Sequence, residues 1–236
     1  MTVAKRYMVN DREQSPLGEA FWALKNCILE VQEDGACKTI LVTGIGDGEG
    51  AAIVAANMAA FLARSGRSVV LVDADLRQPV IHKIFGFGLQ AGELVAAIHG
   101  EKELTAVLRP SGIYNLKLLT NGEKYQGNPV SLLSDEMTKK IIRQLRETAD
   151  FVVINSSPLT FSAHKVISDA CILASKVDGV VMVLDAHGIR TTVAQKAVEL
   201  LKGARANIIG AVLNDVKNEQ DFIYHVEELK QENCGQ

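Results

Sequence analysis

The chain has 236 residues, 47% of them hydrophobic, and a formal net charge of −3. That hydrophobic content suffices for a sizeable core, and the slightly negative charge argues against a general nucleic-acid or anionic-membrane surface. The four cysteines form no C-x-x-C pair, the amino terminus lacks an apolar signal-peptide stretch, and no run approaches the roughly 20 apolar residues of a membrane span. We therefore expect a cytoplasmic protein with reduced cysteines that does not bind nucleic acid.

Strand and helix patterns alternate along the chain after the polar residues 1–14, which we expect to form a flexible arm. Ser15 and Pro16 predict the start of the first helix, because a serine side chain caps free N–H groups and proline suits the first helical position. Apolar residues at helical spacing continue this helix to near residues 33–35. We expect residues 15–236 to form a single domain.

The stretch that organises the chain is residues 38–63, KTILVTGIGDGEGAAIVAANMAAFLA. Residues 39–43 are apolar and β-branched, as in a buried parallel strand, and apolar residues at helical spacing follow from Ala51. The glycines between them are Gly44, Gly46, Gly48 and Gly50. A strand, a glycine loop and a helix together predict a phosphate-binding turn, in which free N–H groups and the helix dipole point at an anion.

The remaining patterns complete an α/β chain. Further strands are predicted at 68–72, 115–120, 151–154, 179–184 and 207–213, short helical pieces within 87–112, and helices at 129–133, 136–148, 166–175, 191–201 and 221–232. Because most strand patterns are apolar throughout, we expect a doubly wound, mostly parallel sheet with helices on both faces. Ligands of such sheets bind at the carboxyl ends of strands, where the glycine loop, Asp73, Asp75 and residues 155–158 fall.

The glycine loop lacks two side chains that a working P-loop uses. That loop reads G-x-x-x-x-G-K-[ST], with the lysine on the β- and γ-phosphates and the hydroxyl on Mg²⁺. Here Gly50 is followed by Ala51 and Ala52, while Asp47 and Glu49 place negative charge where a phosphate would lie. A glycine-rich turn that binds no ligand is therefore one alternative interpretation.

The pattern T-G-x-x-x-G-x-G at residues 43–50, with an acid closing the next strand, resembles the short-chain dehydrogenases. That resemblance implies that the glycines bind the pyrophosphate of NAD and that Asp73 binds the ribose. The family also uses a tyrosine and a lysine four residues apart, whereas no tyrosine of this chain has a lysine at that spacing. An NAD-binding protein of dehydrogenase type stays as a second alternative.

Another resemblance covers residues 15–215 and is carried by several motifs in a fixed order. The motifs are SPLGEAFWAL at 15–24, DADLRQP at 73–79, NPVSLLSDEM at 128–137, SDACILASKVDGVVMVL at 168–184 and IIGAVLND at 208–215. Together they resemble the bacterial tyrosine kinases (BY-kinases), cytoplasmic P-loop kinases of capsule and exopolysaccharide export. This resemblance implies a P-loop NTPase-like fold of the deviant Walker type.

The chain departs from the BY-kinase pattern at positions that carry chemistry. The family's P-loop Lys and Ser/Thr fall at Ala51 and Ala52, and its Walker B aspartate, which helps to hold Mg²⁺, falls at Asn155. The resemblance therefore implies that no catalytic set is intact, while Asp73 and Asp75 remain as candidate ligands of Mg²⁺. If a nucleotide binds, the residues expected to contact it are Gly46, Asp47, Gly48, Glu49, Gly50, Ala51 and Ala52.

These departures favour a pseudokinase that regulates or scaffolds exopolysaccharide or capsule synthesis and export. It requires no cofactor, although weak binding of ATP or ADP with Mg²⁺ is compatible with Asp73 and Asp75. By resemblance, the expected partner is a membrane-embedded polysaccharide chain-length regulator or an active kinase paralogue, which would hold the protein at the inner face of the cell membrane. The alternatives are a weak ATPase or tyrosine kinase with a rearranged loop and a ParA- or MinD-type ATPase, whose extra signature lysine is missing here.

The first helix carries an altered assembly motif. In the family, E-x-x-R-x-x-R helps to close a ring of subunits, and here Glu19 is kept while Trp22 and Lys25 replace the arginines. Tryptophan cannot pair with a carboxylate, and lysine offers a point charge in place of a bidentate fork. We therefore expect a monomer or a dimer in isolation, with Trp22 as either core packing or an exposed contact residue. The family's tyrosine-rich tail is reduced to Tyr224.

Overall fold

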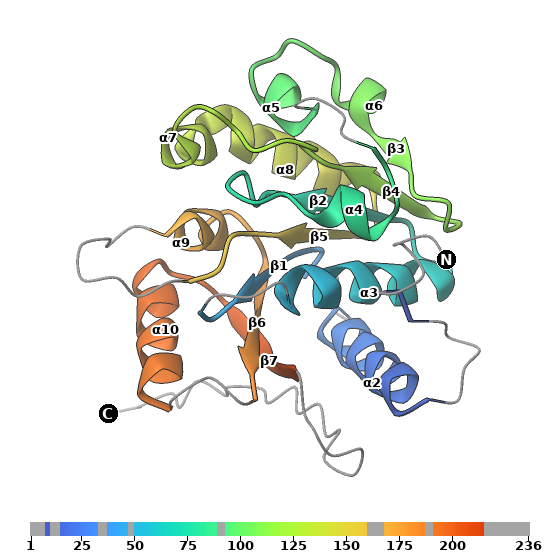
Figure 1. The fold of residues 1–236 in the computed structure, drawn as a ribbon, viewed down its shortest axis with the longest axis vertical. Coiled ribbons are helices and arrows are strands. Elements are labelled where there is room, and N and C mark those ends of the chain that lie inside the picture. The colour runs from blue at the N-terminus through green and yellow to red at the C-terminus, as the bar shows by residue number, and fades with distance from the viewer. Residues whose placement is uncertain are drawn as a thin grey trace.

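The computed structural model describes residues 8–9, 15–32, 37–46, 50–88, 93–159, 168–186 and 191–214. Its strands are β1 (Thr39–Gly44), β2 (Val69–Asp73), β3 (Arg109–Pro110), β4 (Leu116–Leu119), β5 (Phe151–Asn155), β6 (Gly179–Asp185) and β7 (Ile208–Asn214). Its helices are α2 (Pro16–Val31), α3 (Gly50–Arg64), α4 (Ile81–Ile84), α5 (Glu93–Ile98), α6 (Leu104–Val107), α7 (Pro129–Ser134), α8 (Glu136–Thr148), α9 (Asp169–Ala174) and α10 (Thr191–Gly203). Figure 1 shows these elements as one sheet with helices on both sides.

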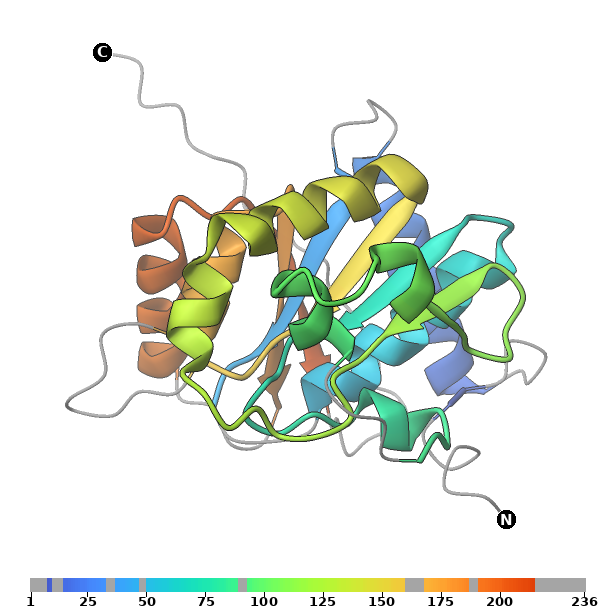
Figure 2. The ribbon, with the colours of Figure 1, turned by 90° about the horizontal axis from the view of Figure 1, so that it is seen from above.

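The described strands form a seven-stranded sheet in the order β3-β4-β2-β5-β1-β6-β7. Every pair is parallel except β3 with β4. Figure 2 shows β1 in blue beside β5 in yellow, with β2 in teal beyond them. The predicted doubly wound, mostly parallel sheet is thus confirmed. We call the side where β1, β2 and β5 end the carboxyl edge, and the side where they begin the amino edge.

The position of β5 bears on the dehydrogenase alternative. In the dinucleotide-binding fold the strand order is 3-2-1-4-5-6, so that the strand with the ribose-binding acid lies directly beside the first strand. Here β5 separates β1 from β2, and Asp73 instead pairs in register with Asn155. The topology therefore argues against an NAD site of that type and brings together two of the predicted site residues.

Two apolar layers enclose the sheet, which explains why its central strands are hydrophobic throughout. On β1, Ile40 and Val42 pack into the cluster formed with α2 and α3, whereas Leu41 packs into the cluster formed with α5, α7, α8, α9 and α10. Figure 1 shows α3 and α8 on opposite sides of β5. A strand buried on both faces has no polar alternation, as predicted for a parallel sheet.

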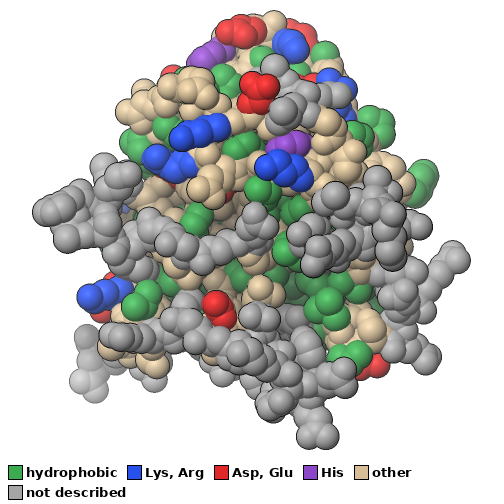
Figure 3. All heavy atoms as spheres, in the orientation of Figure 1, with side chains coloured by type: hydrophobic (Ala, Val, Ile, Leu, Met, Phe, Trp, Pro, Cys, Tyr) green, Lys and Arg blue, Asp and Glu red, His purple; other side chains and the backbone are tan. Residues whose placement is uncertain are grey.

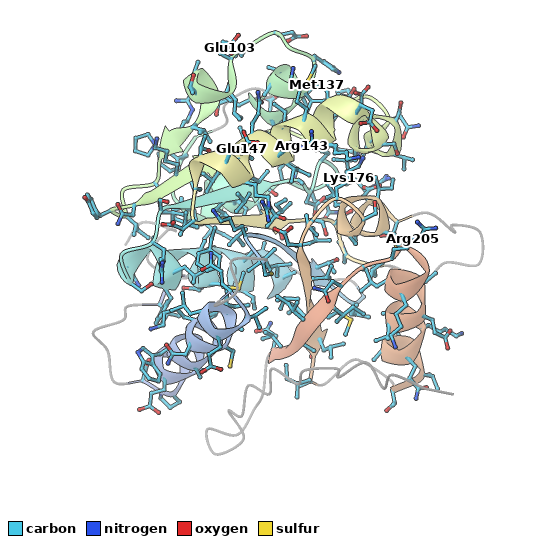
Figure 4. All side chains as sticks on the ribbon, turned by 180° about the vertical axis from the view of Figure 1, so that it is seen from behind. Glu103, Met137, Arg143, Glu147, Lys176 and Arg205 are labelled. Atoms are coloured by element: carbon cyan, nitrogen blue, oxygen red, sulfur yellow. The ribbon has the colours of Figure 1, made fainter. Side chains whose placement is uncertain are left out.

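The helices differ in how much of their surface is buried. Helix α8 is amphipathic: Ile141, Ile142 and Leu145 are buried, while Arg143 and Glu147, labelled in Figure 4, are exposed one turn apart. Helix α3, by contrast, is buried along most of its length, because the sheet lies on one side and α2 on the other. Figure 3 shows side chains of both charges on the face seen in Figure 1.

Some sequence-based expectations differ from the structure or lie outside it. The two-residue antiparallel strand β3 was not predicted, because two residues carry no periodic pattern. The predicted arm, the helix at 221–232 and Tyr224 lie outside the described residues, and the single-domain boundary at residue 15 stays a prediction. Within the described part of the chain, no helix is long and apolar enough to cross a membrane.

Candidate functional site

The first residues after β1 are hydrogen-bonded to the backbone of neighbouring segments. The N–H of Ile45 donates to the carbonyl of Val183 at 2.9 Å, and the N–H of Gly46, whose φ is 87°, donates to the carbonyl of Leu159 at 3.0 Å. These two N–H groups therefore serve the protein's own backbone and are not free for a phosphate. Asp47, Gly48 and Glu49 lie outside the described residues.

Ala51 and Ala52 are packed residues at the start of α3. Their exposed fractions are 6% and 4%, and both belong to the hydrophobic cluster formed with α2 and α3. A Cβ atom added at Gly44 would lie 3.5 Å from the Cβ of Ala51 and 3.6 Å from that of Pro158, so small side chains fill this corner. What remains for an anion is the amino end of α3, whose first N–H groups have no preceding helical carbonyl.

The end of β7 closes over the start of α3, a contact that sequence reasoning missed. A Cβ atom added at Gly50 would lie 2.5 Å from the Nδ2 atom of Asn214. The available signal was positional, because Asn214 directly follows the predicted strand at 207–213 and so had to lie near the carboxyl edge. Its amide now adds a polar group to the boundary of the glycine loop.

Asp73 is a completely buried carboxylate at the end of β2. Its Oδ1 accepts from Nδ2 of Asn155 at 3.0 Å and from the N–H of Asp75 at 3.4 Å. Its Oδ2 accepts from the N–H groups of Val80 and Ile81, both at 2.9 Å. Burial raises the pKa of Asp73 from 3.8 to about 6, because desolvation outweighs the hydrogen bonds from Asn155, Ile81 and Val80.

Asp75 shapes the turn that follows β2. Its Oδ1 accepts from the N–H groups of Arg77 at 3.1 Å and Gln78 at 3.0 Å, and the residue is 8% exposed. Burial raises the pKa of Asp75, and the nearby charge of Asp169 raises it further, against the hydrogen bonds from Gln78 and Arg77. Both aspartates of the D-x-D motif therefore organise the local backbone.

A second network joins β2 to β5 and α9. The guanidinium of Arg77 contacts Asp169 through Nε at 2.6 Å and Nη2 at 3.0 Å, and the Ser157 hydroxyl donates to the same carboxylate at 3.1 Å. Asp169 is the first residue of α9, whose amino-terminal cap is Ser168. The arginine of the D-x-D-x-R motif was the available clue, although its partner lies far along the chain.

His82 is an unexplained buried side chain near the same edge. The residue is 3% exposed, and neither ring nitrogen has a hydrogen-bond partner. Burial lowers the pKa of His82, with a smaller contribution from the charge of Lys83, so the imidazole is favoured in its neutral form.

The described carboxylates do not fit a protein-held Mg²⁺ site. Mg²⁺ demands near-octahedral oxygen ligands, usually one or two carboxylates together with water or phosphate. Both oxygens of Asp73 already accept two hydrogen bonds each, and one of the donors is the amide of its register partner Asn155. Among the described residues, no group of three or more His, Cys, Asp or Glu side chains is arranged to hold a metal ion. The geometry does not support direct coordination by Asp73.

The residues predicted to form an altered assembly motif lie on α2, where Glu19 and Trp22 are exposed. The Ser15 hydroxyl accepts from the N–H of Gly18 at 3.1 Å, which confirms the predicted cap of this helix. Trp22 is 60% exposed, and Nζ of Lys25 lies 5.0 Å from its ring centroid, as in a cation–π contact. Glu19 is also exposed. Trp22 is therefore exposed and not core packing, while its role as a contact residue stays a prediction.

Comparisons with known proteins agree with this fold. Residues 36–225 match the ParA family, described as NUBPL iron-transfer P-loop NTPase. The tyrosine-protein kinase YwqD of Bacillus subtilis is 29% identical over 199 residues, which cover 84% of this chain and 81% of YwqD. The crystal structure of the chimerical protein CapA2B2 has a TM-score of 0.79 at 25% identity and covers 88% of each chain.

A more distant neighbour shares the fold alone. The septum site-determining protein MinD of Pyrococcus horikoshii, complexed with Mg-ADP, has a TM-score of 0.62 at 21% identity and covers 75% of this chain and 70% of MinD. The resemblance to bacterial tyrosine kinases is confirmed, since relatives from several bacteria carry that name. The chain belongs to the ParA family of P-loop NTPases, and within it the chain is similar to the bacterial tyrosine kinases.

Proposed function

We propose that this protein is a catalytically impaired relative of the BY-kinases that acts by binding another protein in exopolysaccharide or capsule synthesis and export. The observation that carries the proposal is the Asn155 amide, which donates to Asp73 where the family resemblance places a metal-holding carboxylate. An amide has no charge, so it cannot replace a carboxylate as a ligand that neutralises Mg²⁺.

The two alanines that begin α3 support the same conclusion. A charge-assisted contact from a P-loop lysine is worth roughly 1.5–3 kcal/mol. Its loss at Ala51 therefore weakens phosphate binding by about one to two powers of ten. Without a firmly held metal, the charge that develops in phosphoryl transfer also lacks its main counter-charge. Binding of ATP or ADP is then weak and confined to the amino end of α3, and no cofactor is required.

Calorimetric titration with Mg-ATP and Mg-ADP, combined with a phosphate-release assay, tests this proposal. We expect dissociation constants in the millimolar range and no release above a protein-free blank. Repeating each titration with EDTA separates binding that depends on Mg²⁺ from binding to α3 alone. Micromolar affinity with turnover would overturn the proposal and favour a weak ATPase or tyrosine kinase that uses Asp73 and Asp75.

The exposed motif on α2 is the proposed binding surface for the partner. Trp22 offers a large flat side chain, 60% exposed, and tryptophan is enriched at the energetic centres of protein interfaces. By the family resemblance, the partner is a membrane-embedded polysaccharide chain-length regulator or an active kinase paralogue. Such a partner would bring this chain to the inner face of the membrane.

Binding assays with purified partners test this surface. Trp22→Ala should weaken capture of the cytoplasmic segment of a chain-length regulator, or of an active paralogue, by about ten-fold or more. Tyr114→Ala is the matched control, because Tyr114 is an aromatic residue that is 87% exposed on the turn before β4. Equal losses for the two variants, or no loss for either, would contradict a role for α2.

The same residues govern self-assembly. Because Trp22 and Lys25 weaken the ionic contact that closes a ring in the family, we propose a monomer or a dimer in isolation. Light scattering at several concentrations measures the mass, and an octamer-sized species would contradict the proposal. The double variant Trp22→Arg, Lys25→Arg should shift the mass upward if the motif alone was changed.

A further inference from the structure

The hydrogen bonds of Asp73 show how the carboxyl edge is held together. An ionised carboxylate has about four lone-pair sites, and all are engaged by protein donors here. Oδ1 takes the amide of Asn155 and the N–H of Asp75, while Oδ2 takes the N–H groups of Val80 and Ile81. The side chain of Asp73 thereby fixes both its strand neighbour and the start of α4. A metal ion would have to displace at least one of these donors.

Asn155 is the residue that makes this arrangement independent of a metal. It is the register partner of Asp73 across β2 and β5, it is 2% exposed, and its carbonyl accepts from the N–H of Ala74 at 2.8 Å. An aspartate at this position would place two carboxylates at hydrogen-bond distance, where like charges repel unless a cation or a proton lies between them. The amide supplies a donor at that point instead.

A cation is already present in the neighbouring network. Arg77 binds the buried carboxylate of Asp169 with two nitrogens, and Ser157 donates to the same carboxylate from the segment after β5. The guanidinium thus compensates the charge of Asp169 and links the turn after β2 to α9. A bidentate arginine–carboxylate pair has a defined geometry as well as a favourable energy.

We propose that these five residues form a metal-independent hydrogen-bond latch that holds the turn after β2 and the start of α4 in one position, in place of a Mg²⁺-dependent site. The hydrogen-bond latch consists of Asp73, Asn155, Arg77, Ser157 and Asp169. It goes beyond the proposed binding function, because it predicts that the conformation of the carboxyl edge is the same whatever the Mg²⁺ concentration.

Hydrogen exchange and thermal unfolding of the full chain, with millimolar MgCl₂ or with EDTA and no nucleotide, test the latch. In the wild type, the unfolding midpoint and the exchange of the Val80 and Ile81 amides should be the same in both solutions. Asn155→Asp should speed exchange of these two amides by about ten-fold or more in EDTA, and MgCl₂ should reverse this change. Asn155→Ala should speed exchange without any response to MgCl₂.

Asn207→Asp is the matched control, because Asn207 is exposed at the amino edge and donates from Nδ2 to the Asp178 carbonyl at 2.9 Å. It should respond to MgCl₂ no more than the wild type does. If Asn155→Asp does not fold, Arg77→Gln provides the second test, with faster exchange that MgCl₂ does not reverse.

A saturable rise of the wild-type midpoint with MgCl₂, or unchanged exchange at Val80 and Ile81 in every variant, would overturn the latch. These outcomes are separate from those of the ATP assays. Turnover of ATP would overturn the proposed function, whereas a Mg²⁺ response without nucleotide would overturn the latch alone.

Discussion

At each edge of the sheet an aspartate accepts four hydrogen bonds. The two carboxylates nevertheless differ in whether their surroundings favour the charged form. At the amino edge, Oδ2 of Asp178 accepts from the N–H groups of Lys38 and Thr39 at 2.9 and 2.8 Å, from the Thr39 hydroxyl at 2.9 Å and from Nε of Arg146 at 3.1 Å. Partial burial raises the pKa of Asp178, but the donors of Thr39, Lys38 and Arg146 outweigh it and lower the pKa overall.

At the carboxyl edge, the same number of donors does not compensate for burial. Asp73 is fully buried and has no arginine against it, so its pKa rises to about 6. The comparison teaches that a hydrogen-bond count alone does not show whether a charge stabilises a fold. Contact with solvent and the presence of a nearby cation decide whether the charge is favourable. A carboxylate kept where its charge is unfavourable is typical of positions used for ligand chemistry.

The largest expected effect is at the amino edge. Asp178→Ala removes the acceptor of four donors and leaves the N–H of Thr39 unpaired in a buried position, which should lower the free energy of unfolding by about 3 kcal/mol. Urea unfolding at neutral pH measures it. Asp150→Ala is the control, since Asp150 also joins neighbouring segments, through the N–H and hydroxyl of Ser68 at 2.8 and 2.9 Å, but at an exposed place. It should cost about 1 kcal/mol or less. Equal costs would contradict the comparison.

The second prediction concerns the opposite pKa shifts of the two aspartates. Because the folded pKa of Asp73 lies above its ordinary value of 3.8, its contribution to stability is present at low pH and is lost as the pH rises through about 6. Relative to Asp73→Asn, the wild type should therefore lose about 2–3 kcal/mol of unfolding free energy between about pH 4 and pH 7.

Asp178→Asn should show the opposite slope. The folded pKa of Asp178 is lowered, so its contribution is present above the ordinary value of 3.8 and is lost as the pH falls. Urea unfolding of both variants beside the wild type from about pH 2 to pH 7 measures the two differences, because the Asp178 contribution changes at and below its ordinary pKa of 3.8 and the Asp73 contribution changes above it. Slopes of the same sign would show that the two edges do not differ as the geometry indicates.

Much of the fold could be predicted from the sequence because its signals are local. Apolar runs marked the parallel strands, and the cap of α2 by Ser15 follows from side-chain chemistry within one turn. The likeness of the loop to a P-loop, and the replacements at Ala51, Ala52 and Asn155, also needed only the order of residues.

The partners within the site could not be predicted, because the fold decides them. Nothing near Arg77 in the sequence points to Asp169 as its partner, and the strand order β2-β5-β1 is what places Asn155 beside Asp73. The contact of Asn214 with Gly50 depends likewise on where β7 joins the sheet. The sequence predicted which P-loop side chains are replaced, whereas the hydrogen bonds among Asp73, Asn155 and their neighbours required the structure.

The third prediction restores the missing ligands at the carboxyl edge. The triple variant Ala51→Lys, Ala52→Ser, Asn155→Asp should raise the affinity for Mg-ATP by about ten-fold or more, because it returns a phosphate-binding ammonium and two supports of Mg²⁺. Calorimetry measures the gain, and the double variant that keeps Asn155 is the control. A folded triple variant without any gain would show that the loop differs in shape as well as in side chains. Asp47, which lies outside the described residues, is then the first position to change.

The smallest expected effects come from substituting one glycine at each edge with alanine. A Cβ atom added at Gly179, where β6 begins, would lie 2.9 Å from both Sγ of Cys37 and Cδ1 of Ile209, inside the packed amino edge. At Gly50 the nearest atom is Nδ2 of Asn214 at 2.5 Å, the end of a side chain that can rotate away. Gly179→Ala should therefore lower the free energy of unfolding by about 1 kcal/mol, and Gly50→Ala should change it by less than about 0.5 kcal/mol.

Thermal and urea unfolding of the two variants measure this difference. A double-mutant cycle identifies its cause, because Cys37→Ala removes the sulfur that the new methyl group would meet. In the Cys37→Ala background, Gly179→Ala should cost less than in the wild type, since only Ile209 then has to move. The same background should leave the effect of Gly50→Ala unchanged, because the two positions lie at opposite ends of the strands. If Gly50→Ala proves the more costly substitution, Asn214 is held as rigidly as the amino edge, and the carboxyl edge is as tightly packed as its counterpart.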